Sequence, residues 1–233
     1  IRLSLVGSEM CIRDSWMAAS GENSDDFALR SGVEALSKIA VDLKVSIPVG
    51  KDSLSMRTKW SENNLDYEVS SPLSGVITAM APVDDVTESV TPELNTSDDT
   101  SILLIKLNNK NRLAGSIFSE ITETKYQHTP DIDDIEVFEK LFSGIQNLLK
   151  SKKILAMHDI SDGGLITTLL EMCFTKKVGM RMDLDDSSGV NEFLFSEEIG
   201  FVIQIKKNNL DEVTNTLTNE NIYVKNIAEI IDG

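Results

Sequence analysis

Residues 154–165 read ILAMHDISDGGL, and this stretch decides the predicted fold. Its first four residues are apolar, which is typical of a buried strand, and the apolar residues 165–174 that follow have the length of a helix. The polar residues 158–164 therefore form a loop that leads from a strand into a helix. Strand, loop and helix together indicate an α/β unit.

This loop has the residues to hold a phosphate and a magnesium ion. Gly163 and Gly164 can open the helix with free N–H groups that face an anion. Asp159, at the end of the strand, can bind Mg²⁺ that bridges phosphate oxygens, and Ser161 can donate a hydrogen bond to a phosphate. In an equally favoured interpretation, Asp162 or Ser161 simply caps the helix, and His158 is packed and hydrogen-bonded.

Strands and helices alternate along the rest of the chain, which predicts a mixed α/β fold. In the second half we also expect strands at 102–107, 201–205 and 222–227 and helices at 132–148 and 210–217. In the first half we expect a helix at 27–43, a strand at 45–49, and over 67–80 either two strands or one strand broken near Pro72. Pro82, Pro92 and the polar run 95–99 form the expected linker.

A second polar loop, PVGKDSLSM at residues 48–56, follows the predicted strand of the first half. Gly50 allows the backbone to approach a ligand, and the next residues supply a cation, a carboxylate and two hydroxyls, including Ser53. That set can hold a phosphate or Mg²⁺, although the spacing of a Walker A loop is missing. A polar turn with Lys51 and Asp52 in solvent is the alternative, and spacing alone favours it.

Four other groups are weaker candidates, and each has a simpler structural interpretation. Glu197 and Glu198, which follow Ser196, can place carboxylates near a metal, but a solvated charge pair is favoured. Cys173 stands in an apolar helix and is expected in the core. His128 stands in a polar stretch and is expected on the surface, and the acidic loop 183–186 lacks the ligand pattern of a calcium site.

Composition limits the partners of the protein. The 233 residues include 22 Lys and Arg against 38 Asp and Glu, so the formal net charge is -16. A surface this acidic repels nucleic acid and anionic lipid, and no apolar run is long enough to span a membrane. We therefore expect neither nucleic acid nor a membrane as partner. Two cysteines without CxxC spacing favour a reducing, cytoplasmic setting.

Five segments resemble the large, glutamine-dependent phosphoribosylformylglycinamidine synthase family. They are WMAA at 16–19, IPVGKDSLSMRTKW at 47–60, SPLS at 71–74, HDISDGGL at 158–165 and FSEEIG at 195–200. The segments occur in order, and the resemblance extends from Trp16 to the end of the chain. It places the chain within the second of the two homologous synthetase halves of that family.

The resemblance implies an aminoimidazole ribonucleotide synthetase-like fold of α/β (α+β) class. Residues 16–94 would be the latter part of the N-terminal domain, and residues 95–233 the C-terminal domain. The implied enzyme is a ligase that converts formylglycinamide ribonucleotide, ATP and glutamine-derived ammonia to formylglycinamidine ribonucleotide. ATP phosphorylates the amide oxygen, because that oxygen is otherwise a very poor leaving group. The remaining synthetase half and the glutaminase domain of the same polypeptide are the implied partners.

The resemblance also assigns roles to individual residues. Asp159 matches a Mg²⁺ ligand and Ser161 a nucleotide contact, in an auxiliary site where ADP is held structurally. Gly50 and Ser53 match positions that touch ATP and substrate in the shorter form of the enzyme. The role of Gly163 and Gly164 at the nucleotide is inferred from the loop residues themselves. Lys51 stands where the shorter form has a metal-binding Asn, so a metal role does not transfer to that position. We expect the other metal ligands and the glutaminase residues outside this chain, which would then be inactive alone.

Residues 1–15 do not fit the resemblance, and we expect them to be a non-native leader such as translated vector or adapter sequence. Two alternatives for the function stay open. One is a structural module in which bound ADP stabilises the fold without turnover. The other is a different ATP-dependent synthetase of the same superfamily, such as aminoimidazole ribonucleotide or selenophosphate synthetase, although the runs GKDSLSM and SPLS argue against it.

Overall fold

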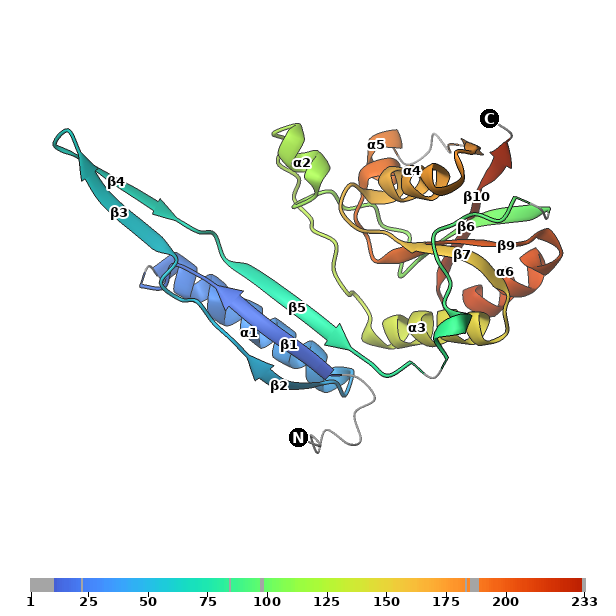
Figure 1. The fold of residues 1–233 in the computed structure, drawn as a ribbon, viewed down its shortest axis with the longest axis horizontal. Helices are drawn as coiled ribbons and strands as arrows, with labels where there is room; N and C mark the ends of the chain where they lie inside the picture. Colours follow the sequence, from blue (N-terminus) through green and yellow to red (C-terminus); the bar gives the residue numbers. More distant parts are fainter. Residues whose placement is uncertain are drawn as a thin grey trace. The chain divides into compact units, whose positions relative to one another are not determined.

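The computed structural model describes residues 11–21, 23–83, 85–96, 99–182, 184 and 189–231. These residues form two compact units, divided after Asp84 (Figure 1). The division falls before the expected boundary at Leu94 because the intervening residues pack on the second unit. Leu94 is buried in that unit's core, and the Met157 N–H donates to the carbonyl of Thr91 at 3.0 Å. The linker is therefore shorter than the sequence suggests.

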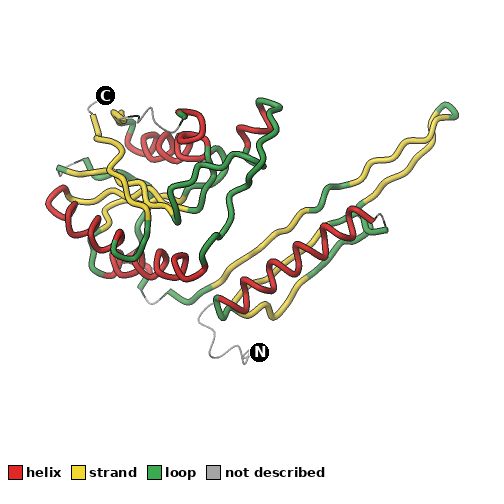
Figure 2. Tube along the Cα trace, turned by 180° about the vertical axis from the view of Figure 1, so that it is seen from behind, coloured by secondary structure: helices red, strands yellow, loops and turns green. Residues whose placement is uncertain are grey.

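Unit 1 is a three-stranded sheet with one long helix beside it (Figure 2). The middle strand, β1 (Cys11–Met17), is parallel to β2 (Ser46–Gly50) and antiparallel to β5 (Ser74–Met80). Helix α1 (Asn23–Asp42) approaches the sheet at Gly32, where a Cβ atom would lie 2.9 Å from the ring of Trp16. The predicted helix and strand of this half are therefore confirmed.

A hairpin of β3 (Arg57–Glu62) and β4 (Leu65–Ser70) completes unit 1. Its turn residues Asn63 and Asn64 both have positive φ, at 53° and 60°, as a tight two-residue hairpin turn requires. The pairing of the two strands is supported by the stacked rings of Trp60 and Tyr67, whose centroids are 5.2 Å apart. Strands β4 and β5 are separated at Pro72, which confirms the expected break; β3 was not foreseen.

Unit 2 is built on a five-stranded sheet with the order β7-β9-β6-β10-β8. The strands are β6 (Thr100–Lys106), β7 (Ile154–Asp159), β8 (Gly179–Met182), β9 (Gly200–Lys206) and β10 (Tyr223–Ile231). Every neighbouring pair among them is antiparallel. The fold class is thus the expected mixed α/β, of the α+β kind, although alternating strands and helices more often accompany parallel pairing.

Helices cover both faces of this sheet, as Figure 1 shows. Helices α3 (Ile135–Lys150) and α6 (Leu210–Thr218) lie on one face, and α4 (Gly164–Lys176) and α5 (Val190–Phe195) lie on the other. The remaining helical turns are η1 (Val86–Glu88), α2 (Ile117–Ile121) and η3 (Lys207–Asn209). None of the described helices has both the length and the apolar composition that a membrane span requires.

Two apolar cores result from this layering, one on each face of the sheet. On β6, Leu103 and Ile105 belong to the core beside α3 and α6, whereas Ile102 and Leu104 belong to the core beside α4 and α5. All four side chains are at most 1% exposed. A strand covered on both faces has a continuous apolar sequence, which explains the unbroken run at 102–105.

The segment expected to be a non-native leader contributes to unit 1. Cys11 to Ser15 form most of β1, and each pairs with a residue of β5, from Met80 to Val76. The origin of residues 1–15 stays a prediction, but their last five residues occupy the middle of the sheet. Removing them would leave β2 and β5 without the strand that joins them.

Deletion of residues 1–15 is therefore expected to destabilise unit 1, in contrast to the unchanged stability that a dispensable leader would give. The loss should exceed about 1 kcal/mol, because the ladder hydrogen bonds and packing contacts of a half-buried central strand disappear. Chemical denaturation followed by the fluorescence of Trp16 and Trp60, both in unit 1, measures the change. An unaltered midpoint would show that the leader is dispensable for the fold.

Candidate functional site

The loop between β7 and α4 is anchored at both ends. Its first backbone N–H, at Ile160, donates to the carbonyl of Gly200 at 3.0 Å. The hydroxyl of Thr168, on the second turn of α4, lies 3.1 Å from the carbonyl oxygen of Asp159 and can donate to it. Thr168 itself is buried. The backbone of the loop is thus tied both to the sheet and to the helix.

The polar side chains of this loop face solvent. The Asp159 side chain is 65% exposed, and Ser161 and Asp162 are exposed as well. Helix α4 has Gly163 as its N-cap, and neither Ser161 nor Asp162 makes a side-chain capping hydrogen bond there. The capping interpretation is therefore wrong for both polar residues before the glycines. A carboxylate and a hydroxyl are available to a ligand at a fixed turn.

His158 is packed as expected. Its Nε2 atom lies 2.9 Å from a carboxylate oxygen of Glu171, and its side chain is 18% exposed. Its Nδ1 atom lies 3.2 Å from a carboxylate oxygen of Asp159, but in a direction that makes no hydrogen bond. His158 therefore lies between two carboxylates, next to the exposed aspartate.

The two glycines of the loop are required by the backbone. Gly163 and Gly164 have φ of +85° and +71°, which residues with a Cβ atom rarely adopt. A Cβ on Gly164 would also lie 2.6 Å from the carbonyl carbon of Phe195. The start of α4 therefore rests directly on the backbone at the C-terminal end of α5.

The amides of these glycines are not free, which differs from the expectation of N–H groups open to an anion. Gly163 donates to Oε1 of Glu197 at 2.8 Å, and Gly164 donates to the carbonyl of Ser161 at 3.0 Å. The protein's own carboxylate thus occupies the position at the helix start. A phosphate at this turn would depend on the side chains of Asp159 and Ser161.

Neither Glu197 nor Glu198 belongs to a solvated charge pair, so that expectation is wrong. Oε1 of Glu197 accepts a second hydrogen bond from the backbone N–H of Ile117, at 3.0 Å. Glu198 is 2% exposed, and Arg112 donates to its two oxygens through Nε at 2.6 Å and Nη2 at 2.7 Å. Sequence analysis missed Arg112 because it lies far away along the chain and stands in no motif.

Lys106 is a second buried cation near this pair. It is 4% exposed, and its ammonium donates to the carbonyl of Lys110 and to the side-chain oxygen of Asn111, each at 2.6 Å. Burial lowers the pKa of Lys106 to about 8; Glu198 opposes that shift, and the charge of Arg112 adds to it. The cluster therefore has a cation that loses its proton more easily than an exposed lysine.

In unit 1, the second polar loop lies along β1. The N–H of Ser53 donates to the carbonyl of Trp16 at 2.8 Å, and the ammonium of Lys51 contacts the Ser53 hydroxyl. A Cβ at Gly50 would overlap the carboxylate of Asp14, so this glycine accommodates the protein's own side chain. The two charged side chains after Gly50 are exposed, as the polar-turn interpretation expects.

The candidate residues thus fall into two groups on separate units, Gly50 with Ser53 and Asp159 with Ser161. Within the described residues, no group of three or more His, Cys, Asp or Glu could hold a metal ion by itself. Magnesium in nucleotide sites, however, is commonly held by one or two carboxylates together with phosphate oxygens and water. Asp159 fits that role.

The remaining candidates have structural explanations. Cys173 is half-buried, and burial raises the pKa of its thiol, which keeps it in the unreactive form. It lines an apolar cavity of about 450 Å³ between α4 and β8. His128 is exposed, as expected. The acidic loop 183–186 lies outside the described residues, apart from Leu184.

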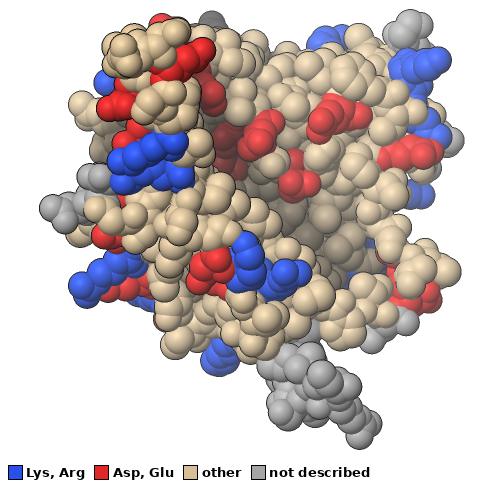
Figure 3. All heavy atoms as spheres, turned by 60° about the vertical axis from the view of Figure 1, so that its left-hand side comes forward, with Lys and Arg blue, Asp and Glu red and all other residues tan. Residues whose placement is uncertain are grey.

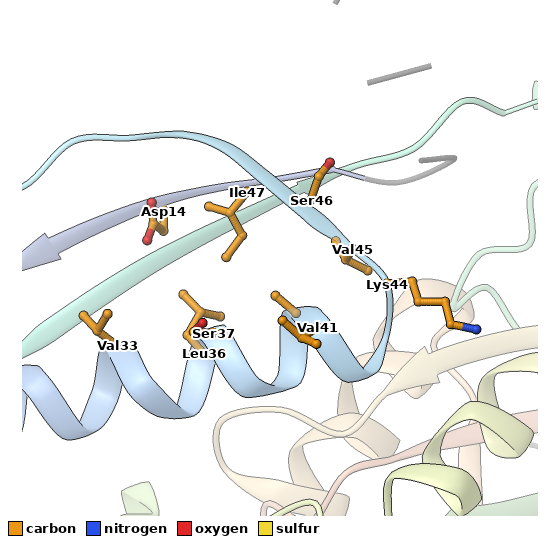
Figure 4. Close-up of a pocket in the computed structure, with 10 residues that line it drawn as sticks. Asp14, Val33, Leu36, Ser37, Val41, Lys44, Val45, Ser46 and Ile47 are labelled. Atoms are coloured by element: carbon orange, nitrogen blue, oxygen red, sulfur yellow. The ribbon is translucent and has the colours of Figure 1, made fainter. Parts of the chain in front are cut away.

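A further cavity, of about 440 Å³, lies between α1 and the sheet of unit 1 (Figure 4). Val33 of the helix and Ile47 of β2 point into it, together with the carboxylate-bearing side chain of Asp14. Its lining does not include Gly50 or the residues after it. Asp14 nevertheless links the cavity to the start of that loop, because a Cβ atom on Gly50 would overlap its Oδ1 atom.

The surface seen in Figure 3 carries both signs of charge, so the net charge of -16 does not gather into one acidic patch on this face. Exposed ion pairs such as Lys110–Asp133 and Arg181–Glu229 hold opposite charges together elsewhere in the described chain. Such pairs contribute little to stability because water screens them. The buried Arg112–Glu198 pair is different.

Replacing Arg112 with Met is expected to lower the free energy of unfolding by about 3 kcal/mol, because it leaves the buried carboxylate of Glu198 without its cation. The double variant Arg112→Met, Glu198→Gln should recover part of that loss. Arg181→Met, which breaks an exposed pair, serves as the control and should have little effect. Equal losses in the two single variants would contradict the assignment. Denaturant unfolding measures all three.

Lys106 predicts a pH dependence of stability. Its pKa is about 8 in the folded chain and about 10.5 when unfolded, so between these values the unfolded chain holds more protons. Stability relative to Lys106→Met should therefore be lowest below pH 8 and rise up to pH 10.5, by about 3 kcal/mol at most. A difference between the two proteins that does not change with pH would refute the shifted pKa.

Two family models match the chain, one on each unit. Residues 7–82 match the FGAR-AT PurM_N-like domain, a range that includes Cys11–Ser15 of β1. Residues 99–233, more than half of the chain, match the C-terminal domain of AIR synthase related protein. The expected fold is therefore confirmed by sequence profiles as well as by architecture.

Solved structures show the same fold. A structure titled "T. maritima PurL complexed with ATP" matches with a TM-score of 0.68 at 13% identity, over 97% of this chain and 34% of that chain. T. maritima PurL complexed with FGAR matches with a TM-score of 0.65 at 12% identity, over 95% and 35%. E. coli HypE matches with a TM-score of 0.67 at 14% identity, over 97% and 69%. The chain thus spans about a third of the length of the PurL chains.

These identities are low, so the structural matches establish the fold and not the substrate. The profile over residues 99–233 establishes the family. That range includes β7, the polar loop and α4. It also includes the buried ion pair of Arg112 and Glu198. From this match and the architecture of both units, the chain belongs to the AIR synthase related protein family.

Proposed function

We propose that the chain is part of a phosphoribosylformylglycinamidine synthase and that the β7–α4 loop holds a nucleotide, ADP or ATP, with Mg²⁺. The exposed carboxylate of Asp159 on an anchored turn is the observation that carries this proposal. The hydroxyl of Ser161 stands on the same exposed loop and can donate to a phosphate oxygen. Gly163 and Gly164 give the turn its shape.

Each residue has a defined part in this binding. Asp159 would supply one oxygen ligand to a magnesium ion that also binds phosphate oxygens. Such an ion neutralises negative charge, which a protein of net charge -16 otherwise repels. The hydrogen bonds at Ile160 and from Thr168 hold the backbone in place before the ligand arrives, so that little ordering is needed on binding.

The complete enzyme would use ATP to phosphorylate the amide oxygen of formylglycinamide ribonucleotide, and ammonia from glutamine would displace the phosphate. Motif order and the FGAR-AT PurM_N-like match on unit 1 support this substrate assignment. Solved PurL structures of similar fold contain ATP, ADP or FGAR, according to their titles. Gly50 and Ser53 would contact ATP and substrate. The other synthetase half and a glutaminase domain would be required for turnover.

A structural role for the nucleotide is the second candidate, and the anchoring of the loop favours it for this part of the enzyme. The turn is bonded to β9 at Gly200, to α4 at Thr168 and to Glu197. A nucleotide bound there would stabilise the native state by linkage without any reaction. The similarity to E. coli HypE keeps another ATP-dependent synthetase of the superfamily as the alternative for the whole enzyme.

Asp159→Asn is expected to release nucleotide, because a neutral amide binds Mg²⁺ far more weakly than a carboxylate does. The protein would be loaded with MgADP, freed of excess ligand and denatured, and the ADP content measured by chromatography. We expect wild-type protein to hold about one ADP and the variant to lose most of it, with a lower melting temperature.

Asp162→Asn is the matched control, since it removes the same charge from an exposed position three residues further along the loop. It should keep the wild-type ADP content. The proposal fails if Asp159→Asn retains wild-type ADP, or if both variants lose it equally.

A further inference from the structure

Glu197 joins two elements that are far apart in the sequence. Its Oε1 atom accepts the N–H of Gly163, at the start of α4, and the N–H of Ile117, the first residue of α2. The two distances are 2.8 Å and 3.0 Å. A single carboxylate oxygen therefore ties the candidate nucleotide loop to the segment around α2. Hydrogen bonds from backbone N–H groups to a carboxylate are stronger than those to a neutral oxygen.

Other contacts hold the same segment against the same turn. The rings of Phe118 and Phe195 are stacked, with centroids 4.6 Å apart. The buried pair of Arg112 and Glu198 lies just before α2 in the chain and just after Glu197. The residues on either side of Glu197 are thus fixed, and its carboxylate is directed at Gly163 by rigid surroundings.

Gly163 is the place where this contact affects the loop. It has a positive φ and follows directly after the exposed Asp162 and Ser161. Its N–H group is held by Glu197, whereas the next N–H, at Gly164, closes the turn onto Ser161. Loss of the Glu197 contact would leave the turn held on that side by the Gly164–Ser161 backbone hydrogen bond, by the Thr167 hydroxyl, which donates to the Gly163 carbonyl at 3.2 Å, and by the close packing of Gly164.

We infer that Glu197 is a positioning residue: through Gly163 it fixes the conformation in which Ser161 and Asp159 meet the nucleotide, and through Ile117 it couples α2 to that loop. The inference rests on the proposed function for the identity of the ligand. Glu197 would not itself touch the nucleotide. Its role requires a hydrogen-bond acceptor at this position and does not require a negative charge.

A rival explanation of the Glu197–Gly163 contact is based on the negative charge of Glu197, and it predicts the opposite effect of a substitution on nucleotide binding. A carboxylate at the start of α4 can act as an internal competitor that occupies the place of a phosphate. Removing the competitor would strengthen the binding of an anion, whether the replacement is Gln or Ala. Removing a positioning acceptor would weaken binding in the Ala variant and spare the Gln variant, which keeps a carbonyl oxygen.

The test measures MgADP binding to the 233-residue chain by titration calorimetry. We expect Glu197→Ala to weaken binding at least about tenfold and Glu197→Gln to bind as well as wild type or better. Glu120→Ala is the matched control, because it removes an exposed carboxylate from α2 and should leave the affinity unchanged. Tighter binding in both Glu197 variants, or unchanged binding in Glu197→Ala, would overturn the inference.

Amide hydrogen exchange without nucleotide separates this inference from the proposed function. Exchange at Gly163 and Ile117 should accelerate in Glu197→Ala and stay slow in Glu197→Gln, at unchanged global stability. If wild-type protein binds no MgADP, the proposed function fails, and exchange alone decides whether Glu197 couples the two segments. Equal exchange in wild type and Glu197→Ala would refute the coupling.

Discussion

The start of helix α4 rests against the backbone of residues 194–196, and the rest of the candidate site depends on this contact. Gly164 makes it possible, since a Cβ there would approach the Phe195 carbonyl carbon to 2.6 Å and the Ser196 carbonyl oxygen to 2.8 Å. Such distances are shorter than any packed interior permits. With α4 in this position, Glu197 reaches Gly163, and the polar side chains of the loop are left facing outward.

Two acidic side chains at the candidate site receive hydrogen bonds from the protein itself. Glu197 receives two backbone N–H groups, and Glu198 receives the guanidinium of Arg112 in a buried, two-pronged contact. Asp159, by contrast, is largely exposed to solvent, as is Asp162 on the same loop. In a chain of net charge -16, a phosphate near this carboxylate requires a cation between them, which is why the proposed ligand includes Mg²⁺.

Periodicity predicted the large elements of both units. The apolar run before the polar loop became β7, the apolar run after it became α4, and the regular spacing before residue 150 became α3. These elements bury one continuous face or both faces, so the spacing of their apolar residues can be recognised in the local sequence. Antiparallel pairing in unit 2 was not predictable, because strand direction depends on how distant segments meet.

Short elements and buried charges were missed for the same reason. Helix α2 has five residues, and its position is set by Glu197 and by the stacking of Phe118 on Phe195. Glu198 resembled a solvated charge because its partner, Arg112, stands in no recognisable motif. Asp159 and Ser161 were selected as candidates because strand-end acids and loop hydroxyls next to glycines have a known chemistry. The hydrogen bond from the Gly163 N–H to Glu197 could be learned from the structure alone.

The central claim is that Asp159 and Ser161 hold a magnesium nucleotide while Glu197 keeps its place at Gly163. A crystal structure of the chain with ADP and Mn²⁺ in place of Mg²⁺ tests it most directly, since manganese is located by its anomalous scattering. The account predicts a manganese peak within about 2.0–2.3 Å of an Asp159 oxygen, phosphates beside the Ser161 hydroxyl, and an intact Glu197–Gly163 hydrogen bond. A nucleotide bound elsewhere, or one whose phosphate has displaced Glu197 from Gly163, would contradict it.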